Sequence, residues 1–309
     1  MARERLGRGR QPSASNLHAI LRRMFRRQTS GSVVCTSCGY LVGVNDEKCY
    51  HCGRRNPGLW GFAPALRNLG HDMGFVPFVT GTCIVLYALG LLVSVMLGFQ
   101  IAGPSLFGFL APAGQVQFLL GASGAGPVFG YGRWWTVLSA GWLHGGLLHI
   151  LFNVMWIRQL APAVGELYGP GRMVIIYTIA SAVGFALSSV MGLFPIPFFG
   201  GGYTTLGASA AIFGLLGALV YYGRRGGSSL VGSQAWSMAV FMFVFGLVMP
   251  GVDNAAHAGG FAGGYLAGRL LDPLKPERID HMIAAVVCLG LSLLSVVASV
   301  VHLLLYVLR

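Results

Sequence analysis

Charged residues are scarce in this sequence of 309 residues. Lys, Arg, Asp and Glu make up 10% of it, against about a quarter in ordinary water-soluble domains, while hydrophobic residues make up 55%. This composition excludes a water-soluble globular domain as the main part of the chain and indicates that a lipid bilayer is its main solvent. Acidic residues are especially few, with nine Asp and Glu against 21 Lys and Arg, so the formal net charge is +12.

The start of the sequence also lacks an apolar stretch, which a secretory signal would place within about the first thirty residues. We therefore expect no cleaved signal. Twelve of the 21 Lys and Arg residues lie before residue 78, ahead of the first long apolar run. The positive charge thus belongs to a segment that we expect in the cytosol, and it does not lead us to expect a nucleic-acid partner.

Seven apolar runs are predicted to cross the membrane, because about twenty helical residues span a hydrocarbon core of about 30 Å. They are Phe78 to Phe99, Gly145 to Leu160, Arg172 to Leu193, Gly207 to Tyr222, Ala235 to Pro250, Ala255 to Leu271 and Met282 to Val307. The connections on one side hold seven Lys or Arg, at Arg158 to Arg172, Arg224 to Arg225 and Arg269 to Arg278, and the alternate connections hold one, Arg133. The positive-inside rule therefore predicts a cytoplasmic N-terminus and an outer C-terminus, in a cell inner or plasma membrane.

Glycine and proline interrupt the stretch between the first two runs, residues 98–133, too often for a continuous lipid-exposed helix. We interpret this stretch as a folded loop at the outer membrane interface. Trp134 and Trp135, which follow it, are expected in the aromatic belt of that interface.

Two CxxC motifs, each followed by Gly, lie near the N-terminus: Cys35-Thr-Ser-Cys38 and Cys49-Tyr-His-Cys52. Four thiolates at this spacing can surround one tetrahedral Zn²⁺, so we predict a structural zinc site. A pair of disulfides is the alternative, which a cytosolic location disfavours. His51 is expected to be a bystander, with its exchange for a Cys ligand as the other reading.

The segment before these motifs, residues 1–30, is basic. Between Asn16 and Arg27, apolar side chains at helical spacing lie opposite arginines, which favours a helix on the surface of anionic lipid. A solvated arm is an equal alternative, and a nucleic-acid-binding tail is a weaker one.

Polar side chains inside apolar runs are costly in a bilayer and therefore point to function. Those that stand out are His144, His149, Asn153, Ser209 and His257. By the charge rule, the run ends that carry them all face the outer half of the membrane. His149 and Asn153 are four residues apart and so share one helix face.

Serine hydrolase chemistry needs a hydroxyl, a base and donors for an oxyanion. We predict Ser209 as nucleophile, His257 as general base, and His149, Asn153 and the backbone N–H of Ser209 as oxyanion donors. Gly207 allows a tight turn before Ser209. Taken singly, a serine in a membrane helix more often bonds its own helix backbone, so the hypothesis depends on the group.

As a group, His144-x4-His149-x3-Asn153, Gly207-x-Ser209 and Ala256-His257-x2-Gly260-x3-Gly264 resemble the rhomboid family of intramembrane serine proteases, over residues 75–271 or so. The resemblance implies a six-helix fold, a Ser209–His257 dyad without a carboxylate, and the oxyanion roles above. It also implies that the Phe213 ring packs on His257, that transmembrane proteins are the substrates, and that catalysis needs no metal. The seventh run is similar to an extra C-terminal helix of some family members.

The expected fold class is thus an all-α membrane protein: a rhomboid-like six-helix bundle with one extra C-terminal transmembrane helix, preceded by a small zinc-ribbon-like module. We expect a basic segment over residues 1–30, the zinc module over 31–57, a linker over 58–77, the protease domain over 78–272, and a linker with the seventh helix over 273–309.

Two departures from the family pattern bear on the site. Gly207-Ala-Ser209-Ala210 replaces the family's GxSG, whereas Gly121-Ala-Ser123-Gly124 fits GxSG fully. Ser123 lies in the broken loop ahead of the first histidine, so we interpret it as a decoy. The family's Trp-Arg pair in the outer loop is replaced by Trp135-Thr136. Whether the usual salt bridge of that loop forms here is therefore an open question at this point.

Two other functions stay as alternatives. An inactive rhomboid-like protein would bind transmembrane helices for trafficking or quality control, and the presence of both Ser209 and His257 argues against it. A small-molecule transporter would predict an internal repeat, and we find none in the sequence. A cytosolic protein partner of the zinc module is a further expectation that the sequence leaves open.

Overall fold

The computed structural model of the chain describes residues 27–64, 72–101, 108–194, 196 and 201–308. The chain divides into two compact units, Met1–Met73 and Gly74–Arg309. The lipid-surface helix that we predicted before the cysteine motifs lies, except for Arg27, outside the described residues.

The first unit is small and built around the cysteine motifs. Strands β1 (Ser32–Val34) and β2 (Leu41–Gly43) pair antiparallel, with Val33 opposite Val42, and a short 3-10 helix, η1 (Leu59–Gly61), follows. Val33, Val42 and Val44 form a buried core with the cysteines. A core of this size is too small to stabilise a unit on its own, which is why such modules usually need a metal or disulfides.

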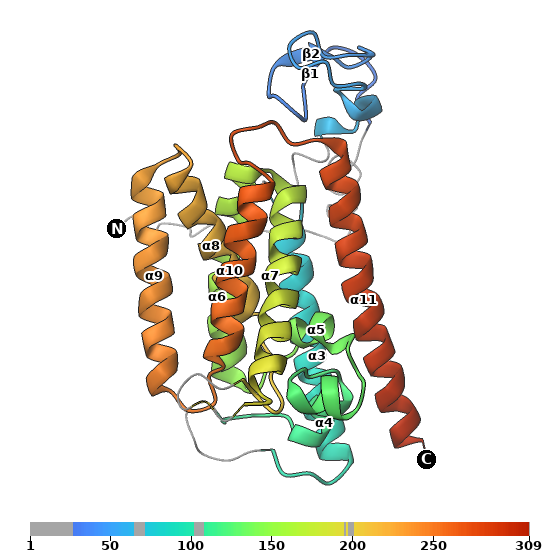
Figure 1. Cartoon of the computed structure of the whole chain (residues 1–309). Helices are drawn as coiled ribbons and strands as arrows, with labels where there is room; N and C mark the ends of the chain where they lie inside the picture. Colours follow the sequence, from blue (N-terminus) through green and yellow to red (C-terminus); the bar gives the residue numbers. More distant parts are fainter. Residues whose placement is uncertain (1–26, 65–71, 102–107, 195, 197–200, 309) are drawn as a thin grey trace, which may run out of the picture. The chain divides into compact units, whose positions relative to one another are not determined.

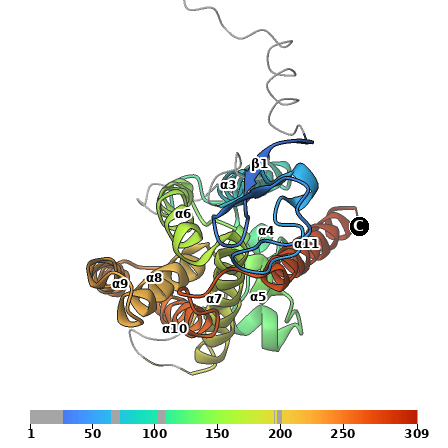
Figure 2. The same ribbon diagram turned by 90° about the horizontal axis from the view of Figure 1, so that it is seen from above.

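The second unit is a bundle of long helices. They are α3 (Phe75–Met96), α6 (Leu147–Tyr168), α7 (Pro170–Met191), α8 (Ser209–Arg224), α9 (Ser229–Val248), α10 (Asn254–Leu270) and α11 (Ile279–Val307). The helix α7 contacts α6, α8, α10 and α11, whereas α9 and α11 lie at opposite edges of the bundle (Figure 1, Figure 2).

Among the described residues, α3, α6, α7, α9 and α11 are long and apolar enough to cross a membrane. The helices α8 and α10 have 16 and 17 residues and lie inside the bundle, where α8 packs against α7, α9 and α10. These features make the chain a multi-pass membrane protein with the predicted all-α fold, and each of the seven predicted runs overlaps one long helix.

The boundaries of α6 differ from the prediction. We predicted that this run ends at Leu160 and that residues 158–172 form a connection, but α6 continues through Pro162 to Tyr168, and Gly169 alone separates it from α7. Proline removes one backbone hydrogen bond from a helix. The buried side chains of Ala161 and Val164 on both sides of it keep the last turns of α6 packed.

Glycine brings α8 and α10 into backbone contact. A methyl group added to Gly260 would overlap the carbonyl oxygen of Ala210, and one added to Gly264 would overlap the backbone of Gly214. Small residues at helix contacts permit this approach in membranes, where lipid supplies no hydrophobic drive for association. The close packing aligns the first turns of α8 and α10.

The segment between α3 and α6 is folded into short helices: α4 (Gly114–Leu119), the π-helix η2 (Gly126–Gly130), α5 (Thr136–Ser139) and η3 (Ala140–Trp142). Arg133 is buried and donates to the carbonyl oxygens of Phe118 and Leu119, at 2.6 and 3.1 Å, at the end of α4. Carbonyl groups at a helix C-terminus attract a cation. Arg133 therefore stabilises this loop through hydrogen bonds to backbone carbonyl groups. The family pattern has a salt bridge in this loop instead.

Candidate active site

The hydroxyl of Ser209 lies 2.9 Å from Nε2 of His257, within hydrogen-bond distance. Ser209 is the first residue of α8, and His257 lies in the first turn of α10. The serine is partly exposed and the histidine is buried. A hydroxyl that can pass its proton to a buried imidazole is the arrangement that activates a serine for nucleophilic attack.

The other ring nitrogen of His257, Nδ1, lies 3.3 Å from Oδ1 of Asn254. An amide oxygen only accepts hydrogen bonds, so this contact requires the hydrogen of a neutral imidazole to be on Nδ1. Nε2 then presents a lone pair to Ser209, as a general base must.

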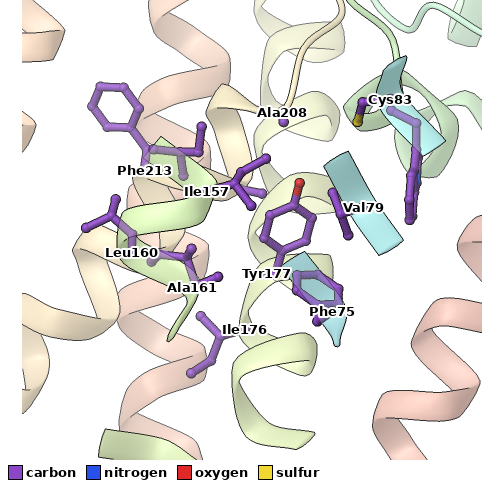
Figure 3. Close-up of a cluster of buried hydrophobic side chains, with 14 of the residues drawn as sticks. Phe75, Val79, Cys83, Ile157, Leu160, Ala161, Ile176, Tyr177, Ala208 and Phe213 are labelled. Atoms are coloured by element: carbon purple, nitrogen blue, oxygen red, sulfur yellow. The ribbon is translucent and has the colours of Figure 1, made fainter. Parts of the chain in front are cut away.

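The ring of Phe213 stacks on the imidazole of His257, with centroids 4.2 Å apart and planes inclined by 16°. Phe213 follows Ser209 by one helical turn, and it is buried in the cluster that includes Ile157 and Leu160 of α6 (Figure 3). The imidazole of His257 is therefore held on one face by the Phe213 ring, which is itself packed in the core.

Asp253 fixes the start of the helix that carries His257. It is the N-cap of α10, its Oδ1 accepts a hydrogen bond of 2.9 Å from the Ala256 N–H, and its other oxygen accepts one from Ser188 of α7. A side-chain acceptor at this position satisfies a backbone N–H that has no partner within the helix. Asp253 thus attaches the beginning of α10 to α7.

His149 lies against the turn that leads into α8. Its Nδ1 accepts a hydrogen bond of 3.2 Å from the Gly145 N–H, so its Nε2 carries the hydrogen. A Cβ atom on Gly207 would lie 2.6 Å from this Nε2, and the φ of Gly207 is 125°, a value that disfavours other residues. Glycine at this position therefore allows both the turn and the approach of a histidine donor, two residues before Ser209.

Asn153 and His144 are more distant members of the predicted group. The amide nitrogen of Asn153 donates to the His149 carbonyl, one turn earlier in α6, at 2.7 Å, and within the described residues Asn153 makes no hydrogen bond to Ser209. The rings of His144 and His149 lie edge to face with centroids 5.2 Å apart. The structure thus brings His257 into direct contact with both Ser209 and Phe213, and it places His149 beside Gly207.

Ser123 has different surroundings. It is buried, its backbone pairs with that of Thr205 through hydrogen bonds of 2.9 and 2.7 Å, and its hydroxyl accepts a hydrogen bond of 3.3 Å from Thr136. In the portion of the chain that the structure describes, no histidine contact of Ser123 is found. Its GxSG motif forms a pairing segment that anchors the loop before Ser209.

The four Sγ atoms of Cys35, Cys38, Cys49 and Cys52 lie within 4.8 Å of one another. The contacts Cys35–Cys52 and Cys38–Cys49 measure 3.8 and 3.6 Å. Tetrahedral coordination with Zn–S bonds of about 2.3 Å separates sulfur atoms by about 3.8 Å, so the group fits a zinc ion.

Backbone N–H groups of the first unit point at two of these sulfur atoms. The N–H of Ser37 points at Cys35 Sγ at 3.4 Å, and a hydrogen bond from the backbone of Cys52 lowers the pKa of the Cys49 thiol to about 7. The His51 ring stacks on that of Tyr40, with centroids 3.6 Å apart, and His51 is not one of the four clustered residues.

Sequence reasoning did not single out Asn254 or Asp253. A signal was present for each of them, because Asn254 lies three residues before His257 and so on the same helix face. An Asp directly before a helical run is a typical N-cap. Neither signal alone indicates a contact with the base.

Comparison with known proteins gives a consistent result. Residues 131–273 match the Rhomboid domain. The chain is 32% identical to rhomboid protease GluP of Bacillus subtilis (strain 168) over 165 residues, which are 52% of this chain and 31% of that protein. It is 34% identical to RHOMBOID-like protein 4 of Arabidopsis thaliana over 141 residues, 44% of this chain and 34% of that protein.

A shorter relative is covered more fully. The chain is 30% identical to putative rhomboid protease YdcA of Bacillus subtilis (strain 168) over 151 residues. These residues make up 48% of this chain and 72% of that protein. The chain therefore spans about a third of the length of GluP and of RHOMBOID-like protein 4, and most of YdcA.

Proposed function

The chain belongs to the rhomboid family, and from that premise we propose that it is a serine endopeptidase that cleaves transmembrane segments of other membrane proteins. One observation carries the proposal: the hydroxyl of Ser209 lies 2.9 Å from Nε2 of a buried histidine, at the beginning of two helices packed inside a membrane bundle.

In the first step, Ser209 Oγ attacks the carbonyl carbon of the scissile peptide bond while its proton passes to His257 Nε2. The imidazolium then gives this proton to the leaving amine, and an acyl-enzyme remains on Ser209. Water, deprotonated by His257, then attacks the ester, and the imidazolium returns the proton to Ser209 Oγ as the carboxylic acid product leaves. No metal takes part in these steps.

The oxyanion of the tetrahedral intermediate needs hydrogen-bond donors. We assign this role to the backbone N–H of Ser209, which begins α8 and so has no acceptor within the helix, to Nε2–H of His149, and to the Asn153 amide hydrogen that is not bonded to the His149 carbonyl. Ser209 and His257 lie in the first turn of their helices and His149 in that of α6, where the helix dipoles favour negative charge.

Three further residues support this group in the proposal. Gly207 leaves space for His149, Phe213 orients the imidazole of His257 in place of a carboxylate, and His144 packs on His149. The substrate is expected to be a helix that unwinds locally, because a helix holds its carbonyl groups in hydrogen bonds. Small residues at the cut and helix-weakening residues nearby would favour such unwinding.

We further propose that Cys35, Cys38, Cys49 and Cys52 hold one structural Zn²⁺ in a module over residues 31–57, joined by a linker over 58–77 to a protease domain over 78–272. The linker and seventh helix over 273–309 complete the chain. In this proposal the N-terminus is cytoplasmic and the C-terminus lies outside an inner or plasma membrane. The zinc module serves folding, anchoring or recruitment of a cytosolic partner.

The competing function within the family is an inactive protein that binds transmembrane helices. A covalent serine probe, a fluorophosphonate or a chloroisocoumarin, separates the two. We expect the purified protein to be labelled, with the adduct on the peptide that contains Ser209, and we expect Ser209→Ala and His257→Ala to lose the label. An unlabelled wild-type protein that is folded would support the inactive alternative.

A further inference from the structure

Asn254 is the first residue of α10 and is buried, with its Oδ1 3.3 Å from Nδ1 of His257. Because the amide oxygen only accepts, it favours the His257 tautomer with hydrogen on Nδ1. That tautomer is the one in which Nε2 can remove a proton from Ser209. A neutral amide achieves this without placing an unpaired charge in the bundle, which would be costly.

A helix-capping role does not account for this side chain. Asp253 is the N-cap of α10, and its carboxylate already accepts the Ala256 N–H and the Ser188 hydroxyl. The side chain of Asn254 is therefore available for the contact with His257.

The backbone of α9 lies directly behind the amide. A methyl group added to Gly246 would overlap Oδ1 of Asn254 and would lie 3.2 Å from its Cγ and 2.8 Å from Cγ1 of Val252. Gly246 is buried near the end of α9, whereas the large side chains of this helix are mostly exposed. The Asn254 amide thus fills the space between α9 and the imidazole, and only a glycine in α9 leaves that space.

We propose that Asn254 is a positioning residue, which holds His257 in its base tautomer and is itself held by the close approach of α9 at Gly246. The inference rests on the proposed Ser209–His257 protease function. It makes α9 a determinant of catalysis through Asn254, although α9 contributes no residue to the dyad.

The first test replaces Asn254 by Leu, which keeps the branched shape of the side chain and removes the acceptor, and by Asp, which keeps an acceptor oxygen at the same position. We expect Asn254→Leu to lower kcat about tenfold with KM unchanged, and Asn254→Asp to restore kcat to within about threefold of the wild type. A residue with only a packing role would behave in the opposite way, because Leu would preserve activity better than Asp.

The second test uses Gly246→Ala, with Gly81→Ala in α3 as the matched control, since a methyl group on Gly81 meets no atom within 4 Å. We expect Gly246→Ala to lower kcat several-fold because the methyl group displaces the amide from His257. In the Asn254→Ala background the overlap with the amide is absent and only the contact with Val252 remains, so the same substitution should have little further effect on kcat.

These outcomes separate the inference from its premise. If the effects of Gly246→Ala and Asn254→Ala on kcat multiply, or if Asn254→Leu cleaves at the wild-type rate, the positioning role is wrong while the protease function stands. If the folded wild-type protein neither cleaves a transmembrane substrate nor reacts with a fluorophosphonate, the proposed function fails and the inference fails with it.

Discussion

The imidazole of His149 is oriented by the backbone N–H of Gly145, just before α6 begins. Its Nδ1 accepts from the Gly145 N–H, and its Nε2 faces Gly207, so the donor hydrogen is fixed before any substrate binds. Preorganised donors of this kind stabilise developing charge without reorganisation during the reaction. Among the side chains that we propose as oxyanion donors, His149 is the one whose donor hydrogen the backbone orients.

We therefore predict that His149→Ala lowers kcat by about a hundredfold or more, the usual effect of removing one oxyanion donor. Asn153→Ala should also be slow. Both variants should still react with a serine probe at Ser209, because the nucleophile and base remain. Initial rates at saturating substrate decide this, with His51→Ala, an exposed histidine in the first unit, as the control. Wild-type kcat in either variant would remove that residue from the mechanism.

At the scale of residues, motif spacing singled out side chains that contact one another in the structure. The serine motif, the histidine motif and the aromatic residue one turn after Ser209 all lie together in the structure. Asn254 was missed although it lies three residues before His257, because that spacing alone does not indicate a contact with the base. Its approach to Gly246 of α9 was hidden, since a contact between different helices has no signature in local spacing.

The two shortest of the long helices, α8 and α10, depend on glycine for their alignment. Gly264 lies against the backbone of Gly214, and Gly260 lies against that of Ala210. The distance between Ser209 and His257 is set by this backbone contact, since each residue lies in the first turn of its helix.

A methyl group at Gly264 should force these helices apart. We predict that Gly264→Ala lowers Tm on the order of 5 °C, because overpacking typically costs about 1–3 kcal/mol, and that it lowers cleavage as well. Gly290→Ala in α11 is the control, because a methyl group there meets no atom within 4 Å, and alanine is the better helix former. Equal Tm values for the two variants would contradict the packing role of Gly264.

Among the elements, the long helices were predictable and some of their ends were not. The apolar runs predicted which segments form the long helices, but we placed a connection from Arg158 onward, where α6 continues to Tyr168. Tertiary packing of Ala161 and Val164 outweighs the single backbone bond that proline removes. The short helices between α3 and α6 were likewise hidden, because the hydrogen bonds of Arg133 and Ser123 that hold them join distant positions.

At the scale of the whole molecule, the cysteine group and the dyad belong to different compact units. The described contacts of Ser209 and His257 all lie within Gly74–Arg309, and a structural zinc ion acts through the local fold that it closes. We therefore expect zinc to be dispensable for bond cleavage itself.

The double variant Cys35→Ser/Cys38→Ser tests this separation. It should lose one bound Zn²⁺ per chain, because two remaining thiolates hold the ion poorly, while cleavage by the purified protein in detergent survives. Metal analysis and a cleavage assay on the same preparation measure the bound zinc and the turnover. Cys288→Ser is the control, because Cys288 lies in α11, outside the group of four cysteines. A double variant that retains zinc would refute the ligand assignment. Loss of zinc and turnover together, with the membrane bundle still thermally stable, would refute the separation of roles.

The most direct measurement for the central claim is the rate of cleavage of a transmembrane substrate in liposomes by the wild-type protein and by Ser209→Ala, His257→Ala and Ser123→Ala, at equal amounts of folded protein. We predict no cleavage above background for Ser209→Ala and His257→Ala, because the nucleophile or its base is missing. Ser123→Ala should cleave near the wild-type rate, since its hydroxyl contacts Thr136 and lies outside the dyad. An active Ser209→Ala beside an inactive Ser123→Ala would show that the nucleophile has been assigned to the wrong serine.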